Sequence, residues 1–266
     1  MCTRTALPTP PRCRHALPAF TLLELIVVIA IVVLLIALLL PALGGVMTSA
    51  RGFRCQMSMR TVAFDFAVFA DESLHGNRGN DALLGGSSFT LETFQESQYG
   101  VDEFWRWGDR SAVSLPDDSG NDPMRCPEVT SPIELRTDSP CSGGAVSPPA
   151  GVSYGFNLRL HREEFEPVPG AFGLRPVILG ERVLDRPDTP LLIDVDGETA
   201  ERLGVPALYT APSAGSTGPF GGDRYWFPSR RHGGTANVAF VGGHVLSAES
   251  PAEFSGWLAP RDRVHP

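Results

Sequence analysis

One run of apolar residues near the N-terminus dominates the hydropathy pattern of the chain. Residues 25–40 are apolar without a break, and no charged residue follows before Arg51. The uncharged stretch 25–47 would form a helix about 35 Å long, which exceeds the roughly 30 Å hydrocarbon core of a bilayer. A helix that is apolar on every side is typical of a membrane span. The pattern therefore predicts a transmembrane segment over residues 25–47.

A secretory signal peptide is the alternative interpretation of this run. Basic residues precede it, and the small residues Ala42, Gly44 and Gly45 follow it, as a signal-peptidase site requires. The run is longer than the usual apolar region of a signal, however, and Glu24 lies at its start. Cleavage after the run remains open on these rules.

A helical pattern continues beyond the apolar run. Pro41 and Gly44-Gly45 predict a kink or local melting, because proline removes a helical hydrogen bond. Apolar residues at helical spacing then predict one face that packs on a globular domain. These residues are Phe53, Met57, Phe64 and Val68, with Val62, Phe66 and Phe69 beside them. Gly76 and Asn77 are stop signals, so we predict one kinked helix over residues 20–75.

The remaining residues, 76–266, are predicted to form a globular domain. The chain has 28 Gly and 24 Pro, which favours turns and short strands over a helix bundle. Strand-like runs occur at 152–158, 177–179, 191–195, 237–241 and 244–246. Gly242-Gly243 between the last two runs predicts a hairpin turn. The fold class expected is α+β, with a long N-terminal helix packed on a small, mostly antiparallel sheet.

The segment at the start of the apolar run carries a resemblance to a known family. Residues 19–30 read AFTLLELIVVIA, which strongly resembles the prepilin-type cleavage and methylation motif of type IV pilins and type II secretion pseudopilins. The resemblance implies a leader over residues 1–19, cleavage between Ala19 and Phe20, and N-methylation of Phe20. The family usually has Gly at the position of Ala19. It also implies that Glu24 acts in assembly by pairing with the Phe20 ammonium of a neighbouring subunit.

A second resemblance lies near the C-terminus. Residues 231–245 read RHGGTANVAFVGGHV, which looks like the H-X9-DG motif that ends many prepilin-like proteins of the DUF1559 family. His232 matches the histidine, and Gly242-Gly243 follows nine residues later, with Gly242 in place of the expected Asp. The same family also has counterparts of Cys55, the Cys126-Pro127 pair, the SYGFN segment and the strand that ends at Asp194.

The cysteines bear on redox state and metal binding. None of the five forms a CxxC pair, so the spacing gives no support for a structural zinc site. Cys126 and Cys141 both lie in the presumed exported domain. In an oxidising compartment they predict either a disulfide or two separate thiols.

Catalytic chemistry has weak support in the sequence. The polar candidates in the second half are His232, His244, Asp194, Asp196 and Glu198. Two histidines and a carboxylate are enough for a metal site, but a twelve-residue spacing across a hairpin favours structural histidines. A calcium site that uses Asp194 and Asp196 is kept as an alternative, since some pseudopilins have one. No G-x-S-x-G, Walker A or dinucleotide motif occurs, so we predict no enzyme and no cofactor.

These patterns together predict a pseudopilin-like structural subunit. The expected partners are a prepilin peptidase, other pilin-like subunits and membrane lipid. The net charge of −8 argues against nucleic acid as a partner. The expected location is the cytoplasmic (inner) membrane, crossed once, with the N-terminus cytoplasmic and the C-terminal domain periplasmic. Two alternatives remain, which are a single-pass anchored binding or sensory protein and an anchored metal-dependent enzyme.

Overall fold

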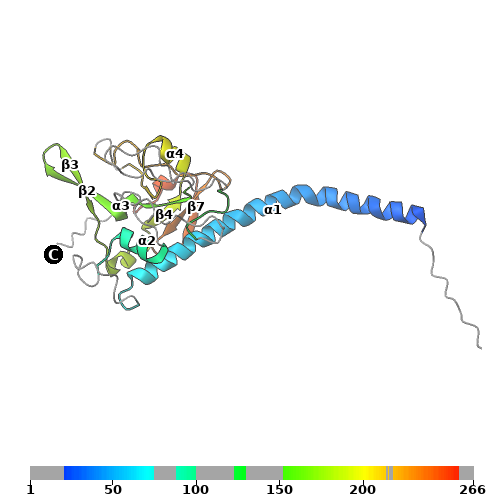
Figure 1. Cartoon of the computed structure of the whole chain (residues 1–266), viewed down its shortest axis with the longest axis horizontal. Helices are drawn as coiled ribbons and strands as arrows, with labels where there is room; N and C mark the ends of the chain where they lie inside the picture. The colour runs from blue at the N-terminus through cyan, green and yellow to red at the C-terminus, as the bar shows by residue number, and fades with distance from the viewer. Residues whose placement is uncertain are drawn as a thin grey trace, which may run out of the picture. The chain divides into compact units, whose positions relative to one another are not determined.

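The structure of the chain is a computed structural model. It describes residues 21–74, 88–99, 123–129, 152–213, 215 and 218–257. The chain divides into two compact units, residues 1–48 and residues 49–266. It is a mixed helix-and-sheet protein with one long apolar N-terminal helix and a mostly antiparallel sheet, as Figure 1 shows.

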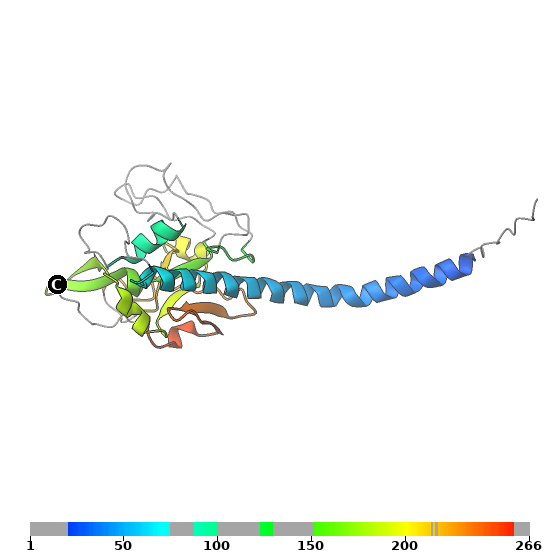
Figure 2. The ribbon, with the colours of Figure 1, turned by 90° about the horizontal axis from the view of Figure 1, so that it is seen from below.

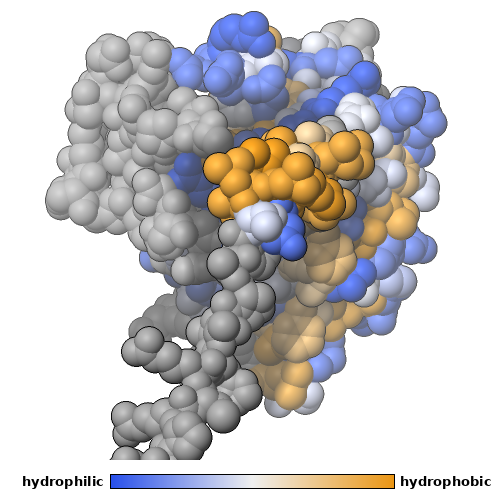
Figure 3. Space-filling view, turned by 90° about the vertical axis from the view of Figure 1, so that its right-hand side faces the viewer, coloured by the Kyte–Doolittle hydropathy of each residue, from blue (hydrophilic) through white to orange (hydrophobic). Residues whose placement is uncertain are grey.

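Helix α1 (Leu22–Ala70) is continuous through 49 residues and belongs to both units. In the first unit, every described side chain of α1 is exposed, and the hydrophobic residues of the surface are drawn in orange in Figure 3. The helix runs through Pro41 without a break, so of the two alternatives predicted here, a kink or local melting, the local melting is wrong. A proline removes one helical hydrogen bond, whereas the Leu- and Ala-rich turns on either side favour the helix.

The second unit contains the remaining elements. They are α2 (Leu91–Tyr99), β1 (Tyr154–Asn157), α3 (Leu158–His161), β2 (Arg162–Val168), β3 (Ala171–Pro176), the 3-10 helix η2 (Glu181–Asp185), β4 (Pro190–Asp194), α4 (Gly197–Arg202), β5 (Tyr209–Thr210), β6 (Ala236–Phe240), β7 (Val245–Ala248) and the 3-10 helix η3 (Pro251–Glu253).

The main sheet has the strand order β5-β1-β4-β6-β7. Its pairs are antiparallel except for β1 with β5, which is parallel. All five residues of the central strand β4 are buried, which explains why its sequence is a nearly continuous apolar run. The structure confirms the strands predicted at the β1, β4, β6 and β7 segments, and also the turn at Gly242-Gly243.

Strands β2 and β3 form a separate two-stranded sheet that the sequence patterns missed. Strand β2 has the sequence REEFEPV and is mostly exposed, so it lacks the apolar bias by which a buried strand is recognised. The strand predicted at 177–179 is wrong. Those residues follow β3, and Leu179 forms only an isolated bridge with Phe89.

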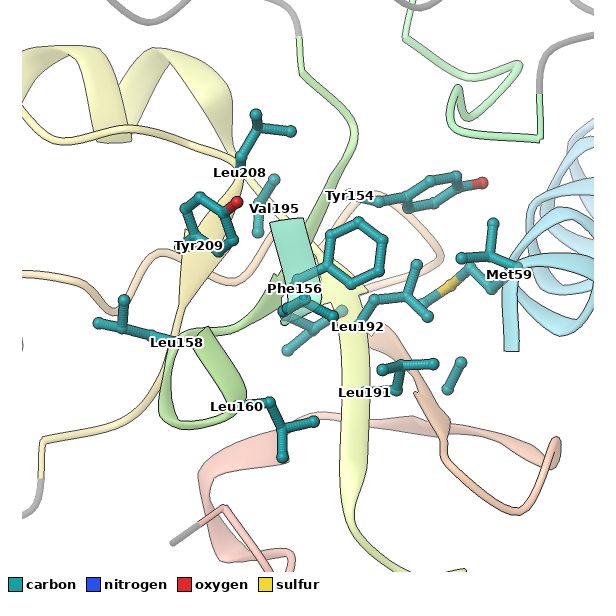
Figure 4. Close-up of a cluster of buried hydrophobic side chains, with 14 of the residues drawn as sticks. Met59, Tyr154, Phe156, Leu158, Leu160, Leu191, Leu192, Val195, Leu208 and Tyr209 are labelled. Carbon is teal, nitrogen blue, oxygen red and sulfur yellow. The ribbon is translucent and has the colours of Figure 1, made fainter. Parts of the chain in front are cut away.

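The second half of α1 packs on the sheet and on α2. Figure 4 shows Met59 of α1 directed toward core residues of β1 and β4, including Phe156 and Leu192. Helix α2 lies beside this part of α1 in both ribbon views (Figures 1 and 2). Between the two helices, the rings of Phe66 and Phe94 are packed edge to face, with centroids 5.2 Å apart. Gln56 of α1 also donates hydrogen bonds to Asn237 of β6 and Ser247 of β7.

The predicted packing face of α1 is wrong in part. Val62, Phe66 and Phe69 are buried as expected. In contrast, Phe53, Met57 and Phe64 are 62%, 42% and 65% exposed. Successive helical residues are about 100° apart, so these three residues lie on the side of α1 opposite to the buried one. The part of α1 in the second unit therefore has two apolar faces, of which the domain covers one.

Candidate functional site

The start of α1 is built by a reciprocal capping box. The backbone N–H of Glu24 donates to Thr21 Oγ1 at 3.2 Å. In return, the backbone N–H and the hydroxyl of Thr21 donate to Glu24 Oε2 at 2.9 and 2.8 Å. This arrangement satisfies N–H groups that have no partner inside the helix. Ala19 and Phe20, the predicted processing residues, lie outside the described residues, so cleavage between them remains a prediction.

The residues of the predicted C-terminal motif, His232 and Gly242-Gly243, do not form one site. Gly242 is at the β6–β7 turn, where its N–H donates to the carbonyl of Pro187 at 2.9 Å. A Cβ at Gly242 would lie 2.7 Å from the Cβ of Pro187, so a larger residue than Gly has no room here. Gly243 has a φ of +82°, the left-handed conformation that the turn requires. Both glycines are thus accounted for by the turn.

His232 instead belongs to a buried polar cluster with Asp194, Glu128 and Cys126. Its Nε2 lies 3.1 Å from Asp194 Oδ2, and its Nδ1 lies 3.1 Å from Glu128 Oε2. Cys126 Sγ is 3.8 Å from the same Nε2. The side chains of His232 and Glu128 are 8% and 11% exposed, and that of Asp194 is fully buried.

Three segments that are far apart in the sequence build this cluster. Asp194 ends β4, and its Oδ2 also accepts from the backbone N–H of Asn237 in β6 at 2.9 Å. Arg231 donates to the carbonyls of Ser153 and Val195 at 2.9 and 2.6 Å, which holds the segment before β6 against β1 and β4. Glu128 and Cys126 come from the short described loop 123–129.

The cluster favours a charged imidazole. Burial by itself lowers the pKa of His232, but the hydrogen bond to Asp194 and the negative charges of Asp194 and Glu128 outweigh burial and raise the pKa above its ordinary value. Arg231 opposes this shift, with its Nε 4.0 Å from Asp194 Oδ1. A protonated His232 and Arg231 together balance the two carboxylates.

A disulfide joins Cys55 of α1 to Cys126 at the edge of the cluster. The predicted pairing of Cys126 with Cys141 is therefore wrong, because a cysteine sulfur forms one disulfide bond. Cys141 itself lies outside the described residues. The closed loop spans 71 residues, and a crosslink of that size stabilises a fold by about 4 kcal/mol in the chain-entropy description.

The other predicted candidates are separate from this cluster. Asp196 caps α4, where its carboxylate accepts from the backbone N–H and hydroxyl of Thr199 at 3.2 and 2.6 Å. His244 stacks on Phe240 with ring centroids 4.4 Å apart, and its Nε2 is 3.8 Å from Asp188 Oδ1. Glu198 is exposed. His232 and His244 thus have different partners, and the calcium site that would use Asp194 and Asp196 stays a prediction.

In the described part of the chain, one group of three or more metal-ligating side chains comes together. It consists of Cys55, Cys126 and His232, whose ligand atoms lie within 4.8 Å of one another.

The sequence patterns missed the roles of Glu128 and Arg231. Each is adjacent in sequence to a residue that was singled out, Glu128 to the Cys126-Pro127 pair and Arg231 to His232. Their position next to these residues is the feature of the sequence from which Glu128 and Arg231 could have been predicted.

These features define an α+β protein with a long apolar helix that is tied by a disulfide to a sheet domain. No protein-family model matches the chain, and neither a curated protein nor a solved structure matches it.

Proposed function

We propose that this chain is a pseudopilin-like structural subunit. In this proposal a prepilin peptidase removes residues 1–19, α1 anchors the chain in the cytoplasmic membrane, and the processed subunits assemble into a type II secretion or type IV pilus-like fibre. The domain after α1 lies outside the membrane and acts through packing rather than catalysis. The observation that carries the proposal is the segment FTLLE at residues 20–24, directly before the apolar run.

The character of α1 supports an anchor that can also bundle with its copies. It is the one helix in the described ranges that is long and apolar enough to cross a membrane. Its described side chains in the first unit are exposed to the surroundings, so lipid or other apolar helices are required to cover them. The exposed Phe53, Met57 and Phe64 extend an uncovered apolar surface into the second unit.

The capping box adds a constraint on how Glu24 acts. Within a single subunit the carboxylate already binds Thr21, which leaves its charge to interact with a cation. In the fibre that cation is the N-terminal ammonium of a neighbouring Phe20. Capping is a role that a neutral side-chain oxygen also fills, whereas the pairing needs the charge.

The difference between capping and pairing defines the experiment. Glu24→Gln keeps a side-chain oxygen for Thr21 but removes the charge, and Thr21→Ala weakens the cap but keeps the charge. We expect Glu24→Gln to insert normally and to enter fibres about tenfold less or worse, since a hydrogen bond between charged groups is lost. Thr21→Ala should assemble nearly as well as the wild type. Full fibre incorporation of Glu24→Gln would contradict the assembly role.

The mature N-terminus separates this proposal from the two alternatives. Mass spectrometry of the membrane-bound chain should find an N-methylated Phe20 as its first residue. A chain that starts at Met1, or after residue 40, would instead make α1 a simple anchor or an export signal. It would then favour an anchored binding protein or enzyme.

A further inference from the structure

The buried cluster around His232 has a donor set that the proposed assembly function does not use. Two sulfurs, an imidazole nitrogen and a carboxylate oxygen converge from α1, from the loop 123–129, from β4 and from the segment before β6. Thiolate and imidazole together are the ligands that Zn²⁺ prefers in proteins. The disulfide occupies the two sulfurs in the structure, so their metal chemistry depends on its reduction.

We propose that the reduced form of this protein binds one thiophilic divalent cation, of which Zn²⁺ is the natural example. The ligands are the Cys55 and Cys126 thiolates, His232 Nε2 and Asp194 Oδ2. The disulfide and the metal-bound dithiol are then two alternative links between α1 and the sheet domain.

The distances fit a tetrahedral site once the sulfurs separate. Zinc ligands at about 2.0–2.3 Å from the metal lie roughly 3.3–3.8 Å from each other. The observed distance from Cys126 Sγ to His232 Nε2 is 3.8 Å, and that from Nε2 to Asp194 Oδ2 is 3.1 Å. All three Cys and His ligand atoms already lie within 4.8 Å of one another. On reduction the two sulfurs are free to separate, and Asp194, which contacts this three-residue group through His232, completes the ligand set.

His232 has a carboxylate oxygen beside each of its ring nitrogens. Its Nε2 faces the sulfur and Asp194, while its Nδ1 faces Glu128 Oε2 at 3.1 Å. A carboxylate on the far nitrogen fixes the ring orientation and tautomer of most histidines that ligate metals. In the oxidised structure Glu128 Oε2 is close enough for this role, but Nδ1 forms no hydrogen bond with a described residue. The N–H of Asn237 holds Asp194 Oδ2 in place. The Oδ1 of the fully buried Asp194 accepts no hydrogen bond from the described residues.

α1 comes close to the cluster because Gly52 lies beside it. A Cβ at Gly52 would lie 3.5 Å from His232 Nδ1, so the helix passes directly over the imidazole. Cys55 is three residues further along α1 and is fully buried. The site would therefore join the helix to the domain whether the two sulfurs are bonded to each other or to a metal.

A phosphine can reduce the disulfide between Cys55 and Cys126 to two thiols. The phosphine attacks one sulfur and breaks the Sγ–Sγ bond. It then takes an oxygen atom from water to become the phosphine oxide, and the two protons of that water complete the two thiols. Binding of Zn²⁺ displaces these protons and forms two Zn–S bonds. Oxidation by an external disulfide reverses the change, since the two thiolates give up two electrons to it and the metal is released.

Metal titration of the full chain in detergent tests the proposal. The background variant carries serine at Cys2, Cys13 and Cys141, so that only Cys55 and Cys126 remain. After phosphine reduction we expect one Co²⁺ per chain, with a thiolate-to-cobalt absorption in the near ultraviolet, and displacement of Co²⁺ by Zn²⁺. The oxidised protein should bind none.

Variants in the cluster assign the ligands. Cys55→Ser and His232→Gln should abolish the thiolate–cobalt signal or shift it strongly. Glu128→Gln changes the carboxylate beside the far nitrogen and should weaken the affinity by about 10- to 100-fold. A reduced, folded chain that binds no Co²⁺ would overturn the proposal, and so would binding that is unchanged in His232→Gln.

A second measurement tests the proposal if the protein loses its structure when the disulfide is reduced. If the dithiol form unfolds, Zn²⁺ should restore the circular dichroism spectrum of the oxidised protein and protect both thiols from alkylation. Failure of Zn²⁺ to do either would overturn the proposal. None of these outcomes depends on fibre assembly, so they are independent of the proposed function.

Discussion

Two buried histidines show how the surroundings of a residue decide its charge. His161 stacks on Tyr209 with ring centroids 3.8 Å apart. Its burial first, and then the nearby Arg162, lower its pKa from 6.5 to about 3, although Glu92 opposes the shift. His232 is also buried, but two carboxylates raise its pKa above 6.5. The same residue type is therefore neutral at one position and favours the charged form at the other.

The pH dependence of stability should follow from these opposite shifts. For His161 the folded pKa is depressed, so its contribution is complete above pH 6.5 and is lost as the pH falls toward about 3. For His232 the folded pKa is raised, so its contribution is complete below pH 6.5 and is lost as the pH rises through the folded pKa. Denaturant unfolding in detergent should show a smaller acid loss for His161→Phe than for the wild type. An unchanged acid limb would contradict the buried neutral His161.

Among the secondary-structure elements, α1 contributes one face to the hydrophobic core and the opposite face to the proposed assembly surface. Its buried face meets an aromatic cluster in which Phe66 and Phe69 of α1 contact Phe89 and Phe94 edge to face. Such pairs contribute about 0.5–1.5 kcal/mol each beyond the burial of their area. Its opposite face exposes Phe64, two positions away from Phe66. Because of helical geometry, Phe66 therefore packs in the core, whereas Phe64 is available for the proposed subunit contacts.

Alanine substitutions at Phe64 and Phe66 should separate stability from assembly. Phe66→Ala is expected to lower the free energy of unfolding by about 3–5 kcal/mol, because it leaves a cavity in the core. Phe64→Ala should leave stability nearly unchanged but reduce fibre incorporation, since the proposed subunit contacts use that face. The two variants remove the same atoms, so each is the control for the other. Normal assembly of Phe64→Ala would remove this face from the interface.

For the molecule as a whole, the two units differ in what stabilises them. Residues 49–266 contain the buried core, the sheet and the disulfide. In residues 1–48 no described side chain is buried. An apolar helix without a protein core needs a membrane or other helices around it.

Membrane extraction should reveal this difference. We expect the wild-type chain to stay with membranes at alkaline pH and to be released only by detergent. A double variant with Ile29→Lys and Ile36→Lys should be released, because each lysine near the centre of a span costs about 2.5–3.5 kcal/mol. Release of the wild-type chain without detergent would contradict the anchor.

The sequence by itself determined the features that depend on neighbouring residues. The apolar run predicts α1, because a helix forms through contacts between residues a few positions apart. The mostly antiparallel sheet was predictable in the same way, since β4 is a short apolar run and β6 and β7 flank a Gly-Gly turn. The segment FTLLE also predicts processing, a local recognition event that stays a prediction.

Only the tertiary structure decided which distant residues meet. Cys126 pairs with Cys55 rather than Cys141, since the packing of α1 on the sheet brings Cys55 to the loop 123–129. The same packing selects which apolar face of α1 is buried, and it brings His232, Asp194 and Glu128 together. The spacing of these residues in the sequence does not predict such contacts, because the contacts depend on how separate elements pack together and not on neighbouring residues.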